Sequence, residues 1–458
     1  MGVAPETTDR PSLTLELVKA GVMVCPGCRG RLALTGATAR CSSCDAVYPA
    51  HAGVLCLLSP PPAALTPGNV PAALVDAVLD KLSLPRLPAV SGAVRQAVAD
   101  TRLQVAEDFL TAEIAELTDR LGITVGARAA TPPAVPSTAT PILEYVNDYL
   151  EECMPPAATL LRSVRVANAG VNEVAGAALV ASWEDAEGRP AGVPDQTSPM
   201  LCRLRPGQAT TVILRLQTPA RPGPYRLVVR PAALADATPR PTICSRPIEI
   251  ASEPSIGLSL PRSDQALDYD ADHREATALL TAFVAERLGA RCGRFLEIGG
   301  GIHPQAAMLA AAGHDVVNVD VSYPLTQLGA LWFAHPGAEW IRAGRLAFLT
   351  CDGNRLPFGD GSFDAVLMFA TLHHIALPDR FLAGLRRVLK PDGFVGVFCE
   401  PNEPNPEDPA YRRDLEKGVN EQQFSIPEYA AIFARAGLEV IGGRNDRGSL
   451  KAMLRFTA

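Results

Sequence analysis

Two pairs of cysteines near the start of the chain have the spacing of metal ligands. The pairs are Cys25-Pro-Gly-Cys28 and Cys41-Ser-Ser-Cys44, with twelve residues between them. Such spacing is typical of a four-cysteine zinc ribbon, in which each pair forms a knuckle around one ion. Four thiolates close the coordination shell, so we expect a structural Zn²⁺ and not a catalytic one. Two disulfides are the competing interpretation, and the absence of a signal-peptide pattern in the opening residues counts against them.

A glycine-rich turn in the last third of the chain has the form of a ligand-binding loop. Glu297-Ile-Gly-Gly-Gly301 follows an apolar strand and precedes a helix, and a second strand ends at Asp320. Glycines let the backbone approach a ligand closely, and a helix start offers unpaired N–H groups. The turn could hold a dinucleotide or S-adenosylmethionine. Glu297 favours the second, because a carboxylate suits a cationic amino-acid end and repels a pyrophosphate. Asp320 can accept hydrogen bonds from ribose hydroxyls of either ligand.

The stretch 349–375, LTCDGNRLPFGDGSFDAVLMFATLHHI, resembles the middle motifs of class I S-adenosylmethionine-dependent methyltransferases. The helix, Pro-Asp-Gly turn and strand that follow also resemble this family, and together the similarity spans about 200 residues. The resemblance implies that Asp352 bonds the adenine amino group, that Gly353 lies beside the ring, and that Ala370 and Thr371 line the donor.

The resemblance also bears on the glycine turn itself. The family's loop carries a third glycine, and His303 stands at that position here, which puts the close approach of the donor in doubt at that point. The predicted donor site comprises residues of four segments: Glu297, Gly299, Gly300, Gly301, Asp320, Val321, Asp352, Gly353, Ala370 and Thr371.

Two adjacent histidines follow the strand FDAVLMF, at the rim where an acceptor would approach. An acceptor hydroxyl must lose a proton, and His373 or His374 could take it, because an imidazole titrates near neutrality. The alternative is that the pair is structural, with one ring bonded to the backbone and the other packed under the donor. We therefore name both as catalytic candidates and leave the structural role open.

The elements that must position these residues divide the chain into several parts, as its 458 residues lead one to expect. From 276 onward helix and strand patterns alternate, which predicts an α/β, Rossmann-like, doubly wound parallel sheet. The predicted parts are a disordered tail (1–15), a zinc ribbon (16–60), a helical segment and linker (61–157), an all-β sandwich (158–252) and the methyltransferase domain (253–458). Within the third part, PILEYVNDYLEE is expected to be helical.

Two of these parts resemble known modules. The sequence around the cysteine pairs resembles small zinc-ribbon proteins and N-terminal extensions that accompany some methyltransferases. The run PGQATTVILRLQTPARPGPYRLVV resembles immunoglobulin-like modules found inside or beside bacterial enzymes. The zinc-ribbon similarity covers about forty residues, and the immunoglobulin-like similarity covers under a hundred. Both therefore imply much less about function than the methyltransferase motifs do.

Composition narrows the function. A net charge of −7 and a pI near 5.6 argue against bulk nucleic-acid binding. No apolar run is long enough for a membrane span, so we expect a cytoplasmic protein. The leading prediction is methylation of a small-molecule acceptor, such as a natural product or sugar-containing metabolite, with oxygen as the favoured atom. One alternative is a modifier of RNA or protein that docks through the zinc ribbon. The other is a non-catalytic scaffold that binds S-adenosylmethionine.

Overall fold

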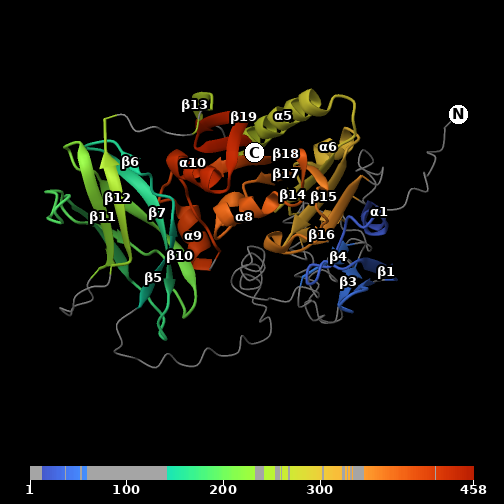
Figure 1. Cartoon of the computed structure of the whole chain (residues 1–458), viewed down its shortest axis with the longest axis horizontal. Helices are drawn as coiled ribbons and strands as arrows, with labels where there is room; N and C mark the ends of the chain where they lie inside the picture. Colours follow the sequence, from blue (N-terminus) through green and yellow to red (C-terminus); the bar gives the residue numbers. More distant parts are fainter. Residues whose placement is uncertain are drawn as a thin grey trace.

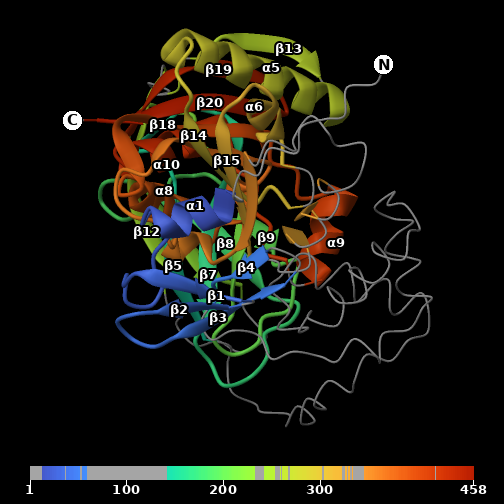
Figure 2. The ribbon, with the colours of Figure 1, turned by 90° about the vertical axis from the view of Figure 1, so that its right-hand side faces the viewer.

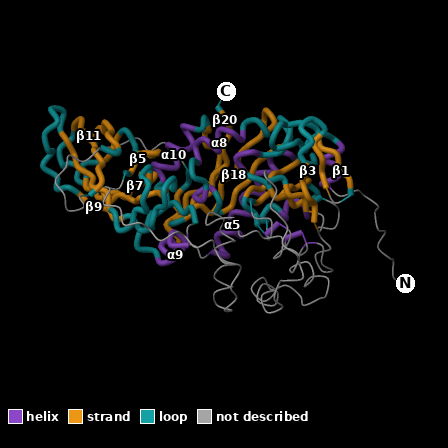
Figure 3. Tube along the Cα trace, turned by 90° about the horizontal axis from the view of Figure 1, so that it is seen from below, coloured by secondary structure: helices purple, strands orange, loops and turns teal. Residues whose placement is uncertain are grey.

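The computed structural model describes most of the chain outside one long segment. The described residues are 13–36, 38–51, 54–58, 142–232, 242–252, 258, 260–266, 269–301, 304–321, 325–326, 329–330, 333, 345–417 and 419–457. The predicted helical segment and most of the linker, together with His303, lie outside these residues. The described parts form a row, with a β module at one end and the cysteine-containing unit at the other (Figures 1 and 3).

A twelve-stranded sheet forms the centre of the molecule. Its order is β1-β2-β3-β4-β16-β15-β14-β17-β18-β20-β19-β13. Five neighbouring strands, β16 to β18 in this order, run parallel, and β20 is antiparallel to β18. The bounds are β13 Arg262–Ala266, β14 Arg294–Ile298, β15 Asp315–Asp320, β16 Leu346–Thr350, β17 Phe363–Phe369, β18 Leu389–Pro401, β19 Leu438–Arg447 and β20 Ser449–Phe456. The predicted Rossmann-like parallel sheet is confirmed.

Helices cover both faces of this sheet, which explains why its central strands are mostly apolar. Every residue of β17, FDAVLMF, is buried. On one face the strands pack against α5 (Tyr269–Leu288) and α6 (Ala307–Ala311). On the other they pack against α8 (Pro378–Leu385), α10 (Ile426–Arg435) and α1 (Leu13–Lys19). A parallel sheet buried on both faces needs apolar side chains at consecutive positions.

The cysteine unit, residues 13–58, is an extension of this sheet. It consists of α1 and the strands β1 (Leu32–Thr35), β2 (Thr38–Cys41), β3 (Val47–His51) and β4 (Val54–Cys56). β4 pairs in parallel with β16, and Figure 2 shows α1 and these strands in blue at this end. α1 begins at Leu13, so the predicted tail 1–15 was too long; Leu13, Leu17 and Val18 are buried against the sheet.

The β module, residues 142–252, consists of two sheets around one apolar core. Their orders are β10-β7-β5 and β6-β12-β11-β8-β9. The bounds are β5 Leu143–Asp148, β6 Cys153–Met154, β7 Thr159–Asn168, β8 Ala178–Glu184, β9 Gln196–Pro199, β10 Ala209–Gln217, β11 Gly223–Pro231 and β12 Cys244–Ile250. The module starts earlier than 158, and the predicted helix PILEYVNDYLEE was wrong, because its first half pairs with β7 as β5.

A buried lysine joins the last two strands to α5. The ammonium of Lys451 lies 2.6 Å from Asp272 and 2.8 Å from Asp446, and the lysine side chain is fully buried. The carboxylates raise the pKa of Lys451 although burial opposes its charged form. Among the described residues no helix is long and apolar enough to cross a membrane.

Candidate active site

The glycine loop after β14 is held by close contacts from neighbouring strands. Gly299 has φ +76° and Gly301 has φ +52°, conformations that glycine adopts without the strain other residues incur. A Cβ on Gly299 would lie 2.5 Å from the Thr371 side chain, and one on Gly300 would lie 2.4 Å from Asn318 Oδ1. The loop is therefore glycine-rich because Thr371 and Asn318 approach its backbone closely.

Glu297 is committed to the helix that follows the loop. Its carboxylate is buried and accepts hydrogen bonds from the backbone N–H groups of Gln305, at 2.9 Å, and Ala306, at 2.7 Å. Burial raises its pKa to about 7, in spite of these two bonds. In this structure the side chain fixes the end of the loop, and direct contact with a donor's amino group stays a prediction.

The remaining predicted donor residues lie at the same edge of the sheet, at the ends of β15 and β16. Asp320 ends β15 and accepts a hydrogen bond from the Gly301 amide at 3.2 Å, and Val321 after it is 53% exposed. Asp352 accepts hydrogen bonds from the amide and the side chain of Asn354, and thereby caps the N-terminus of the short helix η3 (Gly353–Arg355). A Cβ on Gly353 would lie 3.5 Å from Ile298, the residue just before the glycines. The loop and η3 are therefore neighbours.

The turn after β17 carries the two histidines. Ala370 has φ +46°, and the chain then forms the short helix η4 (Leu372–His374). Thr371, through its contact with Gly299, sets this turn directly against the glycine loop. His373 is buried and His374 is one-third exposed. The predicted donor loop and the predicted catalytic pair therefore meet at one point.

Glu400 organises this turn, and the sequence analysis did not identify it. Glu400 lies within β18 and is fully buried. Its carboxylate accepts the amides of Thr371 and Leu372, both at 2.8 Å, and lies 2.7 Å from His373 Nδ1. Burial opposes the charged carboxylate, but His373 and the amides outweigh it and lower the pKa of Glu400.

The other side of the histidine turn faces residues 419–425, which follow α9 (Pro409–Lys417). Glu421 lies 3.0 Å from His374 Nδ1 and 3.7 Å from His373 Nε2. Asn420 donates its amide to the His374 carbonyl, and Gln422 donates to the carbonyls of His373 and Ile375. These side chains hold the turn from outside.

The β module in turn holds residues 419–425. Arg165 of β7 donates to Asn420 Oδ1 at 2.9 Å, and Thr211 of β10 donates to Gln422 at 2.9 Å. Ile213 of the same sheet packs with two buried residues of α9, Tyr411 and Leu415. The three-stranded sheet therefore lies beside the histidine turn, with one layer of side chains between them.

Comparisons with known proteins agree with this geometry. A family model described as a methyltransferase domain matches residues 296–397. An O-methyltransferase of Aspergillus nomiae is 32% identical over 178 residues, which cover 36% of this chain and 73% of the relative. The chain belongs to the S-adenosylmethionine-dependent methyltransferases.

The matches to other relatives of this methyltransferase cover a smaller share of those relatives' length. The 27-O-demethylrifamycin SV methyltransferase of Amycolatopsis mediterranei is 34% identical over 38% of the chain and 64% of the relative. A demethylmenaquinone methyltransferase of Clavibacter sepedonicus is 37% identical over 23% of the chain and 40% of the relative. A solved methyltransferase of Burkholderia thailandensis, with 1,6-didemethyltoxoflavin and S-adenosylhomocysteine bound, is 22% identical, with a TM-score of 0.33, covering 42% of this chain and 80% of that one.

The four paired cysteines of the methyltransferase converge at one point. Cys25 Sγ lies 3.7 Å from Cys44 Sγ, and Cys28 Sγ lies 3.4 Å from Cys41 Sγ. All four are free thiols in the structure. Arg29 directly follows the first pair and Asp45 directly follows the second, and both have a positive φ. The two knuckles therefore have the same backbone turn.

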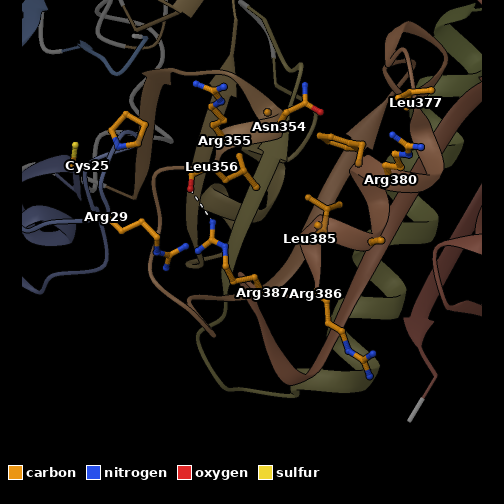
Figure 4. Close-up of a pocket in the computed structure, with 15 residues that line it drawn as sticks. Cys25, Arg29, Asn354, Arg355, Leu356, Leu377, Arg380, Leu385, Arg386 and Arg387 are labelled. Carbon is orange, nitrogen blue, oxygen red and sulfur yellow. Dashed lines mark hydrogen bonds between the residues drawn. The ribbon is translucent and has the colours of Figure 1, made fainter. Parts of the chain in front are cut away.

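A wide groove lies between the cysteine unit and α8 (Figure 4). Its volume is about 830 Å³, and Gly353 is the residue of the predicted donor site that lines it. Five arginines line it: Arg29, Arg355, Arg380, Arg386 and Arg387. Of these, Arg29 and Arg387 share Asp360. The groove is therefore a cationic surface beside η3, and is distinct from the glycine loop.

Proposed function

We propose that this methyltransferase transfers the methyl group of S-adenosylmethionine to a small-molecule acceptor, with oxygen as the favoured atom. The observation that carries the proposal is the contact between Gly299 and Thr371, which sets the histidine turn against the glycine loop. Donor and acceptor must be aligned for this displacement, in which an acceptor lone pair bonds the methyl carbon as the carbon–sulfur bond breaks. The rifamycin and Aspergillus relatives, named for O-methylation, support oxygen.

The donor would lie along the carboxyl edge of β14, β15 and β16. Asp320 would face the ribose, Asp352 and Gly353 the adenine, and the glycine loop the methionine part. Asn318 Oδ1 supports this fit, because it is buried at Gly300 without a hydrogen-bond partner among the described residues. A buried acceptor without a partner is costly, and a ligand N–H at the loop would satisfy it.

His373 and His374 are the catalytic candidates on the acceptor side. Glu400 fixes the ring of His373, so that Nε2 points away from Glu400 and towards Glu421. A ring held in one orientation by a carboxylate is suited to act on a bound acceptor. Residues 419–425 and, behind them, the β module would then form a wall of the acceptor site.

Calorimetric titration with S-adenosylhomocysteine tests the donor site. We expect micromolar binding by the wild type and weaker binding by Asp352→Asn, which keeps the size of the side chain and the acceptor oxygen for Asn354. Asp364→Asn is the matched control, because that carboxylate pairs with Lys390 at the far end of β17. No binding by the folded wild type would refute the donor site. Binding without transfer to any acceptor would favour a scaffold.

We also propose that the four paired cysteines hold a structural Zn²⁺. Four thiolates about 2.3 Å from one ion would lie roughly 3.8 Å apart. The Cys25–Cys44 and Cys28–Cys41 sulfur–sulfur distances, 3.7 and 3.4 Å, are near this value. The amides of Gly30 and Ser43 point at Cys28 and Cys41 sulfurs at 3.4 Å, as expected for thiolate ligands. One zinc per chain in the wild type and none in Cys41→Ser would support this site.

The arginine-lined groove favours a second candidate function, modification of RNA or protein. Arg355 and Arg380 have no ion-pair partner among the residues that the structure describes, and Arg29 extends the groove onto the cysteine unit. Arginine binds phosphates and carboxylates well. If the partner is RNA, Arg355→Gln with Arg380→Gln should weaken binding and its salt dependence. Unchanged or absent RNA binding would leave the small-molecule function in place.

A further inference from the structure

Three side chains with nitrogen and oxygen ligand atoms converge beside the histidine turn. The ligand atoms of His373, His374 and Glu421 all lie within 4.8 Å of one another. The distance from Glu421 to His374 Nδ1 is 3.0 Å, and the distance to His373 Nε2 is 3.7 Å. Two ligands in neighbouring positions around one ion, each about 2.1 Å from it, lie roughly 3.0 Å or a little more apart. The spacing fits a metal ion, which would replace the present contacts of His374 Nδ1 with Glu421 and with the Asn420 carbonyl 3.3 Å away.

The hydrogen bonds of His373 leave one ring nitrogen for this cluster. Nδ1 lies 2.7 Å from Glu400, which is ionised and accepts, so Nδ1 carries the proton. Whenever the ring is neutral, Nε2 presents a lone pair towards a Glu421 oxygen 3.7 Å away, too far for a hydrogen bond. A histidine that donates one N–H to a carboxylate and presents the other nitrogen is the usual arrangement at protein metal sites.

The acidic side chains at the cluster favour a cation. Glu400 is fully buried and the side chain of Glu421 is 12% exposed, and among the described residues their ion-pair contacts are to His373 and His374, with no lysine or arginine. Burying carboxylates without compensation is costly.

We propose that His373, His374 and Glu421 bind one divalent transition-metal ion, such as Zn²⁺, Mn²⁺ or Fe²⁺, with Glu400 orienting His373. Two imidazoles and one carboxylate suit these ions and leave coordination positions open. The proposal rests on the proposed function, because Thr371 sets this turn against the donor loop. An acceptor hydroxyl bound at an open position would have a lowered pKa, which methylation of oxygen needs. This ion is separate from the zinc of the cysteine unit.

The number of metal ions per full-length chain tests the proposal. The protein is saturated with Mn²⁺ or Co²⁺ after zinc loading, dialysed, and measured by inductively coupled plasma mass spectrometry. We expect two ions per chain in the wild type and one in Glu421→Gln. Glu416→Gln is the matched control: it removes an exposed carboxylate of the nearby α9 and should keep both ions. Glu400→Gln should bind the second ion about 10- to 100-fold more weakly.

Two further measurements keep the result unambiguous if a variant folds poorly. In the cobalt-loaded wild type, the second ion should add absorption of nitrogen and oxygen ligation without a thiolate charge-transfer band. A single ion per wild-type chain, lost in Cys41→Ser, would overturn the proposal, as would two ions in both Glu421→Gln and the wild type. Titration of the same samples with S-adenosylhomocysteine separates the two proposals: donor binding with one ion refutes only the second metal, whereas absent donor binding refutes the proposed function.

Discussion

Glu297 should couple the stability of the fold to pH. The perturbation is Glu297→Gln, which keeps the size of the side chain. A glutamine has one acceptor oxygen for two amides, and its own NH₂ would face the second amide. A buried donor left without an acceptor costs about 1–3 kcal/mol. We therefore expect the variant to be less stable than the wild type in acid, where the wild-type carboxyl is protonated.

The difference between the two proteins should shrink as the pH rises. The pKa of Glu297 is raised from 4.5 to about 7 in the folded protein, so the folded state binds the proton more tightly than the unfolded state. The stability contributed by this group is complete below pH 4.5 and is lost as the pH rises through about 7. A shift of this size corresponds to about 3 kcal/mol, and glutamine has no such titration.

The assay is urea unfolding of both proteins, followed by circular dichroism at several pH values between about 4.5 and 8. The difference in unfolding free energy isolates Glu297, because all other titrating groups, including Glu428, are common to both proteins. A difference that stays constant across this range would refute the reasoning. It would mean that the two amide bonds, or water at the carboxylate, offset the cost of burying its charge.

Three further predictions concern packing and alignment. Lys451→Met should lower the unfolding free energy by about 3–5 kcal/mol in urea titrations, because it leaves buried carboxylates without their cation; a loss below about 1 kcal/mol would contradict this network. Gly299→Ala should weaken S-adenosylhomocysteine binding at least about tenfold in calorimetry, since its φ is +76° and its Cβ would meet Thr371. Gly384→Ala, in open space on α8, should leave binding unchanged. Arg165→Met should slow methyl transfer without changing donor affinity, because it releases Asn420 and the histidine turn; unchanged kinetics would refute this support.

The sequence predicted the central sheet well, because its strands depend on local pattern. A strand buried on both faces must be apolar at consecutive positions, and FDAVLMF could be placed without knowledge of its neighbours. The ends of strands also followed from turn chemistry, as at Asp320. The convergence of the four paired cysteines also followed from their spacing alone. These features need only residues close together in the chain.

The errors arose where distant segments decide the structure. Residues 143–148 contain Leu, Tyr and Val in a short run compatible with helix or strand, and pairing with β7 decided for strand. Nothing in the sequence around Glu400 indicates its burial, which depends on the amides of a turn 28 and 29 residues earlier. No local signal identified Glu421 either, because its partners follow a different strand.

In the proposed acceptor site, the β module would support the histidine turn. The turn has a buried carboxylate on the sheet side and amide side chains on the other, and those amides are themselves bonded to β7 and β10. Without the module, Gln422 and Asn420 would lose partners, and residues 419–425 would be free to move away from the turn. A site whose wall comes from another module can change its acceptor by changes in that module, while the glycine loop and the donor stay as they are.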